Sequence, residues 1–217
     1  MSERRPRALL LVLATTALPL SAGGLEVAAG LAIGPTDRGP GPGDRKDGTT
    51  ALQLRVGWDR SPSQWRMDQL QFLGQAGSNE YLQYATAGAG WQRSWWTEHH
   101  GVQAALGAEL RVERYRGHSS LAAGPSPLDG EQAWMVRPWL RAQVGFRGLL
   151  IPLHEPAGPL LAWLTQGGTI THPFTRLEVA VPLWHQGGDG PTGTLRQMAP
   201  RWEASVQLGV RFGWRTP

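Results

Sequence analysis

The stretch VQLGVRFGW, residues 206–214, places an apolar side chain at every second position and ends on two aromatic residues, Phe212 and Trp214. Successive side chains of a β-strand point to opposite faces, so this stretch predicts a strand with one apolar face. The opposite face holds polar residues such as Gln207 and Arg211. The fold therefore depends on whether lipid or protein lies against the apolar face.

The same alternation recurs along the chain in segments of strand length, which are separated by clusters of Gly, Pro and Asp. This pattern is typical of an all-β protein built from hairpins. The regular segments are residues 25–33, 50–59, 102–113, 134–146, 176–183 and 202–214. Two further segments are less regular, and we assign their residues Leu70, Phe72, Leu82 and Tyr84 to the apolar face.

Residues 147–171 decide the expected number of strands. Within them LLIPL at 149–153 alternates, and it resembles VAVPL at 179–183 in having proline as its fourth residue. If 149–153 ascends and 160–171 descends, the chain forms ten strands and leaves no long segment without structure, which is the commoner arrangement. Read as one long loop, the same residues leave eight strands. We predict ten strands, with eight as the alternative.

Alternation alone does not say which face is buried. In a soluble sandwich or barrel the apolar face packs inward, whereas in a closed antiparallel up-and-down transmembrane β-barrel it contacts lipid. The long apolar faces and the mixed polar faces of this chain favour the second arrangement. The charged residues in the inward phase are Arg55, Asp59, Glu109, Arg111, Glu113, Arg137, Arg141, Arg176, Glu178, Glu203 and Arg211.

Tryptophan residues gather near the predicted strand ends, and this also favours a membrane barrel. With strands running alternately up and down from a periplasmic amino terminus, they form two opposed bands, as headgroup interfaces favour. The inner band contains Trp58, Trp65, Trp91, Trp95 and Trp96, with Trp214 at the last strand. The outer band contains Trp134, Trp184 and Trp202.

The first residues resemble a secretory signal peptide. Three arginines, Arg4, Arg5 and Arg7, precede an apolar run from Ala8 to Leu20, and small residues follow it. The run is shorter than the roughly 20 apolar residues of a spanning helix, so we expect cleavage after residue 22. This divides the chain into a signal peptide, residues 1–22, and a single barrel domain, residues 23–217.

The composition excludes several other classes of protein. The absence of Cys excludes a disulfide framework and thiolate metal sites. Removing residues 1–22 takes away three Arg and one Glu, which leaves 18 basic against 16 acidic residues. The basic residues are scattered, so no nucleic-acid partner is expected.

Gln207, Gly209, Phe212 and Trp214 have the spacing polar, x, Gly, x, x, aromatic, x, aromatic. This resembles the terminal signal of Gram-negative outer-membrane β-barrel proteins, although residues 215–217 follow the final aromatic residue. The general organisation resembles the small OmpA, OmpX and OmpW barrels. The resemblance implies bacterial outer-membrane localisation, assembly by the barrel-assembly machinery, and outer-membrane lipid as a partner, with other envelope proteins as further candidates.

Two groups of residues are candidates for chemistry. His118 and Ser120 have the H-x-S spacing of lipid A deacylase barrels, and Glu131 follows as a third triad residue. They lie beside a turn-rich loop, where Ser is an ordinary residue. The adjacent His99 and His100 would point to opposite faces of a strand, which makes them poor co-ligands for a metal. We therefore predict no catalytic, cofactor or metal site.

The inward charges carry the functional expectation. A barrel of eight or ten strands has a narrow interior, where unpaired charges cost several kcal/mol, so we expect the charges to pair and close it. The sequence thus predicts a non-enzymatic outer-membrane barrel with a packed polar lumen, as a structural, assembly or surface-interaction component. The alternatives are a narrow channel for small solutes, a lipid A-modifying hydrolase and a soluble periplasmic β-protein.

Overall fold

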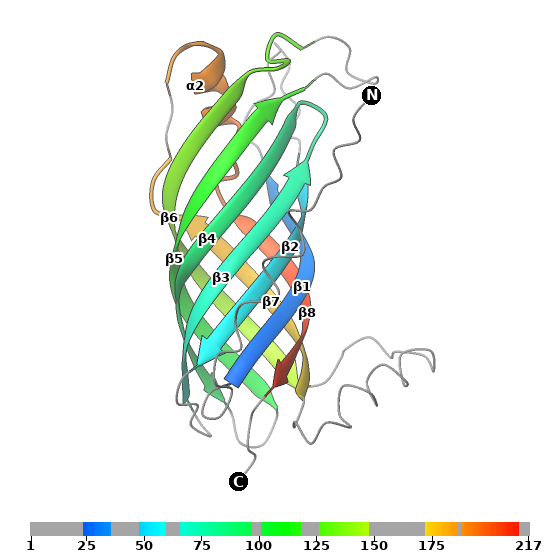
Figure 1. The fold of residues 1–217 in the computed structure, drawn as a ribbon, viewed down its shortest axis with the longest axis vertical. Helices are drawn as coiled ribbons and strands as arrows, with labels where there is room; N and C mark the ends of the chain where they lie inside the picture. Colours follow the sequence, from blue (N-terminus) through cyan, green and yellow to red (C-terminus); the bar gives the residue numbers. More distant parts are fainter. Residues whose placement is uncertain are drawn as a thin grey trace, which may run out of the picture.

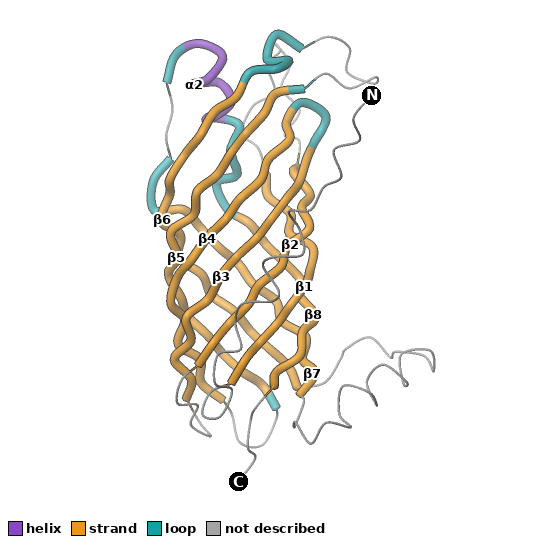
Figure 2. Tube along the Cα trace, viewed as in Figure 1, coloured by secondary structure: helices purple, strands orange, loops and turns teal. Residues whose placement is uncertain are grey.

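The computed structural model describes residues 24–35, 48–59, 66–96, 101–118, 126–147, 172–185 and 188–212. The proposed signal peptide lies outside this part of the chain. The described elements, in chain order, are β1 (Gly24–Pro35), β2 (Gly48–Asp59), β3 (Arg66–Ser78), β4 (Leu82–Trp96), β5 (Val102–Gly117), β6 (Gln132–Arg147), β7 (His172–Pro182), α2 (Gly190–Gln197) and β8 (Glu203–Phe212). The described part of the chain is therefore all-β apart from one short helix (Figure 2).

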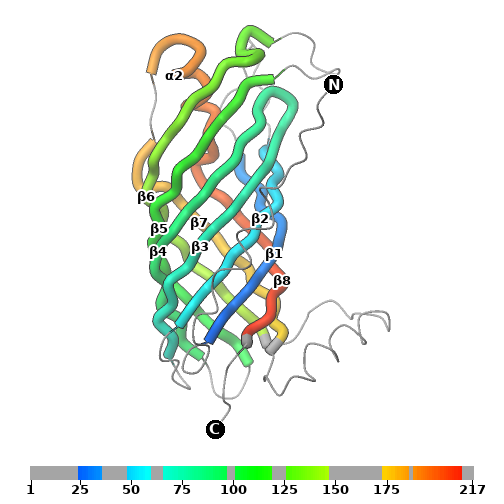
Figure 3. The backbone as a smooth tube through the Cα atoms, in the orientation of Figure 1, coloured from blue at the N-terminus to red at the C-terminus, as the bar shows by residue number. Residues whose placement is uncertain are grey.

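The strands form one closed antiparallel barrel in the order β1 to β8. Each strand pairs with the next in the sequence, and β1 also pairs with β8, from Leu25 opposite Phe212 to Ile33 opposite Ala204. Figure 3 shows β1 and β8 side by side, with the start of β1 and the end of β8 at the same end of the barrel. We call this the inner end and the end that carries α2 the outer end (Figure 1).

The barrel has eight strands, so the prediction of ten was wrong and the alternative of eight is correct. β6 pairs directly with β7, from Trp139 opposite Pro182 to Arg147 opposite Phe174. This ladder leaves no place between the two strands for the pair that ten strands require. Residues 148–171, on which that prediction rested, lie outside the described residues.

The barrel exposes its apolar side chains and buries its charged ones. Leu106 and Val179 are 56% and 51% exposed, whereas Arg111 and Arg137 are 0% exposed. A protein folded in water has the reverse distribution, because burying apolar surface drives its folding. An apolar exterior around a polar interior is the arrangement of a transmembrane β-barrel, with lipid on the apolar face.

The height of the apolar exterior fits a bilayer. Ala104 of β5 lies opposite Trp95 near the inner end, and Arg114 lies opposite Trp134 near the outer end. The ten residues between these levels span about 34 Å along the strand at about 3.4 Å per residue. With a strand tilt of about 40°, this becomes roughly 25 Å, which is the expected height of the apolar band.

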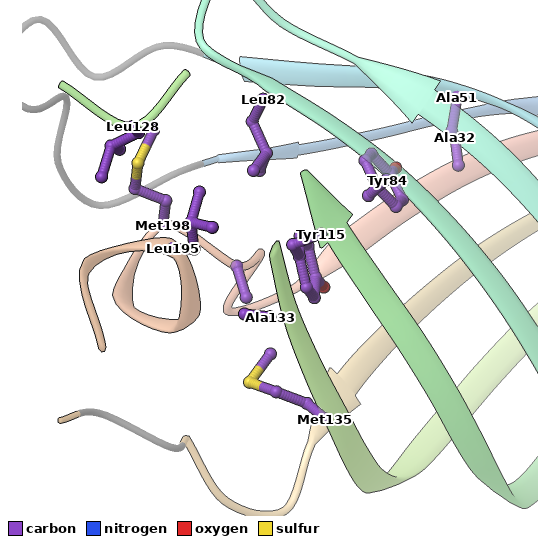
Figure 4. Packing of buried hydrophobic residues seen from close by; sticks show 11 residues of the cluster. Ala32, Ala51, Leu82, Tyr84, Tyr115, Leu128, Ala133, Met135, Leu195 and Met198 are labelled. Carbon is purple, nitrogen blue, oxygen red and sulfur yellow. The ribbon is translucent and has the colours of Figure 1, made fainter. Parts of the chain in front are cut away.

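An apolar cluster fills the outer mouth of the barrel. Its members are Ala32, Ala51, Leu82, Tyr84, Tyr115, Leu128, Ala133, Met135, Leu195, Met198 and Ala199. Figure 4 shows Leu195 and Met198, which come from α2 and the residue after it, facing Leu128 and the upper strands. We call this group the mouth cluster. The expected outer connection between β7 and β8 thus contains a helix that reaches back into the barrel.

The assignment of Leu82 and Tyr84 to the lipid-facing side was wrong. Both residues lie inside the mouth cluster, where they are 0% and 5% exposed. Their strand keeps strict alternation, with Gln83 and Ala85 outward. The interior accepts apolar side chains here because the mouth cluster surrounds them.

No helix among the described residues is long and apolar enough to cross a membrane.

Candidate functional site: the charged barrel interior

All eleven charged residues assigned to the inward phase are buried. They are Arg55, Asp59, Glu109, Arg111, Glu113, Arg137, Arg141, Arg176, Glu178, Glu203 and Arg211, and none is more than 5% exposed. Glu26 of β1 joins them at 1%. Among the described residues the interior therefore holds six arginines and six carboxylates, and its formal charge balances.

The middle layer of the interior is a network that crosses the barrel. Arg55 of β2 donates to Glu109 of β5 at 2.7 Å and to Glu178 of β7 at 2.6 Å. Arg141 of β6 lies 3.1 Å from Glu109 and 3.2 Å from Glu178. Since β2 lies across the barrel from β5 and β7 in the strand order, these side chains span the lumen.

The upper layer is built around Glu113 and Trp139. Arg137 lies 2.7 Å from the Glu113 carboxylate, and the Tyr115 hydroxyl donates to the same oxygen at 2.8 Å. The indole Nε1 of Trp139 donates to the other Glu113 oxygen at 2.8 Å. Arg137 and Arg111 lie 4.8 and 4.0 Å from the centroid of the indole ring, where each gains a cation–π attraction.

Arg111 links the upper and middle layers. Its guanidinium donates to Glu109 at 2.5 Å and also to Glu203 of β8. Gln75 of β3 donates to the second oxygen of Glu203 at 3.2 Å. Charge-assisted hydrogen bonds of this kind are stronger than neutral ones, so the layers form one connected network.

The lower layer is built around Glu26. Arg211 of β8 donates to one Glu26 oxygen at 2.7 Å, and Arg176 of β7 donates to the other. The Arg211 guanidinium also lies over the rings of Trp96 and Phe174, at 4.6 and 4.3 Å from their centroids. This layer joins the first and last strands of the barrel, β1 and β8, through ion pairs as well as through their ladder.

Two interior residues were missing from our sequence assignment, although the same alternation would have found them. Glu26 shares its phase with Ala28 and Ala32, both 1% exposed. Trp139 shares its phase with Arg137 and Arg141, but tryptophan in a membrane strand suggests the lipid interface. Its ring is 1% exposed and lies inside the charge network instead.

Most of the tryptophans in the proposed bands lie exposed on the exterior. Trp58, Trp91 and Trp95 are 37%, 46% and 41% exposed on strands near the inner end. Near the outer end Trp134, Trp184 and Trp202 are 57%, 50% and 43% exposed. Trp96 is half-buried beneath Arg211, and Trp65 and Trp214 lie outside the described residues.

The terminal motif lies on β8, which completes the barrel against β1. Gln207 is buried, and Phe212 is the last residue of the strand. A Cβ atom at Gly209 would clash with the ring of Phe174 and lie 2.7 Å from the Val27 carbonyl oxygen. Local packing therefore requires glycine at position 209. Recognition by the assembly machinery stays a prediction.

The residues considered for chemistry are only partly described. Ser120, His99 and His100 lie outside the described residues. His118 Nδ1 has no hydrogen-bond partner among the described residues, Glu131 included. The described part of the chain contains no group of three His, Cys, Asp or Glu residues that could hold a metal ion.

The outer mouth adds one titratable group outside the spanning strands. Partial burial and the nearby positive charge of Arg137 lower the pKa of His185 below its usual value. The lowered pKa disfavours a second positive charge beside Arg137. Arg137 also donates to the Pro200 carbonyl oxygen at 3.0 Å, which fixes the connection that follows α2.

No family model matches the sequence, and no curated protein matches it. Among solved structures, Neisserial surface protein A has a TM-score of 0.48 and 11% identity, over 88% of this chain and 97% of that chain. Ail, the attachment invasion locus protein of Yersinia pestis, has a TM-score of 0.41 and 10% identity, over 88% and 98%. OprG, an outer membrane protein of Pseudomonas aeruginosa, has a TM-score of 0.33 and 9% identity, over 88% and 95%.

All three similarities are distant. The protein's own architecture, a closed barrel of eight antiparallel strands with an apolar exterior and a charged interior, is that of a small bacterial outer-membrane barrel.

Proposed function

We propose that this protein is a non-conducting outer-membrane barrel that acts through its outer end, as a structural or surface-interaction component. The observation that carries the proposal is the middle layer of the interior. There Arg55 and Arg141 each contact both Glu109 and Glu178, from strands on opposite sides of the barrel. An eight-stranded barrel is only wide enough for side chains to fill, so these residues occupy the space that a pore would need.

Opening a path through this layer would be costly. A solute would have to separate charges that are buried and paired, and an uncompensated buried charge costs several kcal/mol. The mouth cluster forms a second barrier in series at the outer end, where Leu195, Met198 and Ala199 are 0 to 1% exposed. Both barriers support a lumen that does not conduct.

The outer end has features that suit recognition. β5 and β6 contain 16 residues each, against 10 in β8, and their outer ends rise beside α2 (Figure 1). The helix is held by the burial of Leu195 and by the Arg137 contact with the segment that follows it. A surface ordered before binding loses less conformational entropy when a partner binds.

Single-channel recording in planar bilayers tests the proposal. The barrel should be refolded in detergent, and heat-modifiable migration should report the fraction that is closed. We expect no steady openings from the folded fraction. Steady openings would reject a packed lumen and would favour the narrow channel.

Two variants test the barriers one at a time. Leu195→Ser with Met198→Ser loosens the mouth cluster and leaves the ion pairs intact, so it should stay silent in the same recording. Arg55→Ser with Glu109→Ser removes half of the middle layer beneath an intact mouth cluster, and it should also stay silent. Steady conductance from the first variant would show that the ionic layers form no barrier.

A further inference from the structure

Two arginines lie on the exterior of the barrel near its outer end. Arg114 and Arg116 of β5 are exposed and follow Leu110 and Val112 on the same face of the strand. Arg114 lies directly opposite Trp134 in the β5–β6 ladder. Arg116 lies two residues further outward, about 7 Å along the strand. The pair thus begins where the apolar exterior ends.

The level of Trp134 places these side chains among lipid headgroups. Exposed tryptophans of membrane barrels lie at the headgroup interface, and Trp134 is 57% exposed. The Arg114 guanidinium lies 5.7 Å from the centroid of the Trp134 ring. The ring therefore holds Arg114 at the height of a headgroup.

The inner end offers a direct contrast, because two of its exterior arginines pair with a carboxylate. Arg93 lies over Trp91 at 5.0 Å, much as Arg114 lies over Trp134. Both Arg93 and Arg66 contact the carboxylate of Asp68, at 2.7 and 2.9 Å. At this rim one carboxylate serves two arginines.

The outer pair has no such carboxylate among the described residues. Arg114 donates to the neutral amide oxygen of Gln132 at 2.9 Å. Arg116 forms no ion pair or hydrogen bond within the described part of the chain. The acidic residues described in the neighbouring outer connections are Glu80, Asp129 and Glu131, and none of them forms an ion pair with either arginine. Two positive charges therefore face the headgroup level without compensation from these residues.

The lipid-facing surface beside Arg114, on the two neighbouring strands, carries only small side chains. It is made of Gly74 and Ala76 on β3 and Ala85, Ala87 and Ala89 on β4, all exposed. We call these residues the small-residue strip. Ala85 lies opposite both Arg114 and Ala76, and Ala87 lies opposite Gly74. Larger side chains border the strip, so it forms a shallow track that runs from Arg114 into the apolar exterior.

We propose that Arg114 and Arg116 bind the phosphate of a lipid headgroup in the outer leaflet, and that an acyl chain of this lipid lies along the small-residue strip. A guanidinium presents paired donors that match phosphate oxygens, and it binds them more strongly than it binds a neutral acceptor. Charge complementarity selects an anionic lipid over a zwitterionic one. The site lies on the exterior, so it exists whether or not the lumen conducts.

Native mass spectrometry of the folded barrel in detergent tests this site. The barrel should be titrated with phosphatidic acid and, separately, with phosphatidylcholine of the same chain length. We expect preferential retention of phosphatidic acid. Since each basic residue near an anionic surface contributes about 1 kcal/mol, Arg114→Gln and Arg116→Gln should each reduce retention about fivefold.

The inner rim supplies the matched control. Arg66→Gln with Arg93→Gln removes the same number of exterior arginines beside the same kind of ring, and retention should stay unchanged. Arg114→Lys with Arg116→Lys keeps the charge and should restore most of the retention that the Gln variants lose. Equal retention by the parent and the outer double Gln variant would overturn the proposal, as would equal retention of phosphatidylcholine.

Two further arms separate a lipid from free phosphate. A large molar excess of inorganic phosphate should leave phosphatidic acid bound, because the acyl chain adds contacts that phosphate lacks. Ala87→Leu, which fills the strip, should reduce retention, whereas Ala108→Leu, which adds the same volume elsewhere on the exterior, should not. Displacement by inorganic phosphate, or equal effects of the two Leu substitutions, would contradict a lipid site.

Discussion

The two faces of β5 share one backbone but differ in the polarity and the exposure of their side chains. Leu106, Leu110 and Val112 are 43% to 56% exposed on one face, while Glu109 and Arg111 are at most 4% exposed on the other. A soluble barrel would bury the first set, because apolar burial drives folding in water. Here the closed ladder encloses the second set. The contrast teaches that the meaning of an alternating strand depends on what lies outside the barrel.

The charged side chains of the enclosed face depend on one another for their ion pairs. Each carboxylate of the middle layer serves more than one arginine, and Glu109 contacts Arg55, Arg111 and Arg141. The exposed face has no such interdependence, since its apolar side chains carry no charges that other side chains must balance. Substitutions on the two faces should therefore differ in size and in how far their effects extend.

Glu109→Ala should cause the largest loss of stability. It leaves three buried arginines with fewer partners, and breaking a buried ion pair costs about 3–5 kcal/mol. The free energy of unfolding can be measured by denaturant titration in detergent, with heat-modifiable migration as the readout. Glu131→Ala is the matched control, because Glu131 is exposed and its loss should change little. Equal, small effects would mean that the interior charges are hydrated.

Leu110→Arg should cost somewhat less. Leu110 lies near the middle of the apolar exterior, where an arginine on the lipid face costs about 2–4 kcal/mol. Ser78→Arg, at the outer end of β3, should cost only about 0–1 kcal/mol because it lies near the interface. The same unfolding titration in lipid vesicles measures both. A harmless Leu110→Arg would indicate that this face contacts water.

Trp139→Phe should cost about 1–3 kcal/mol, because it leaves a buried oxygen of Glu113 without its indole donor. Trp134→Phe is the matched change on the exterior, where the ring is 57% exposed, and it should have a smaller effect. Fluorescence adds a check, since a water-soluble quencher should not reach Trp139. Efficient quenching of that residue would contradict a filled lumen.

Arg66→Gln should have the smallest effect, between 0 and about 1 kcal/mol, as is usual for exposed ion pairs. Its side chain is 54% exposed, and Asp68 keeps its contact with Arg93 after the change. In the unfolding titration, high salt should reduce this small difference between parent and variant further, because salt screens exposed ion pairs. A large destabilisation would show that this rim pair belongs to the connected network.

The inside and outside of most strands could be predicted from alternation, because a closed barrel leaves no third orientation. For example, alternation within their own strands predicts that Arg55 and Arg211 both point inward, although the two residues lie far apart in the sequence. The pairing of the charges could not be predicted. Which arginine meets which carboxylate depends on strand register and on packing across the barrel, and neither leaves a pattern in a single sequence.

The failures have physical causes as well. Leu82 and Tyr84 were assigned outward because they are apolar, but the mouth cluster makes part of the interior apolar. The helix α2 was missed because its sequence, GPTGTLRQ, contains two glycines and lacks an apolar stripe; its burial comes from tertiary contacts. Ten strands were predicted because 149–153 alternates, a feature that short apolar segments share with true strands.

Accessibility of single cysteines on β5 tests the orientation of the strands most directly. The chain contains no Cys, so Ala105→Cys and Ala108→Cys introduce unique labelling sites with the same small change. Ala108 is exposed on the lipid-facing side, and Ala105 is 3% exposed inside the barrel. In vesicles, a nitroxide at position 108 should collide with oxygen dissolved in the bilayer and not with a water-soluble nickel chelate, while the thiol at position 105 should resist labelling until the barrel unfolds. A label at position 108 relaxed mainly by the nickel chelate, together with ready labelling of the thiol at position 105, would contradict the orientation described here.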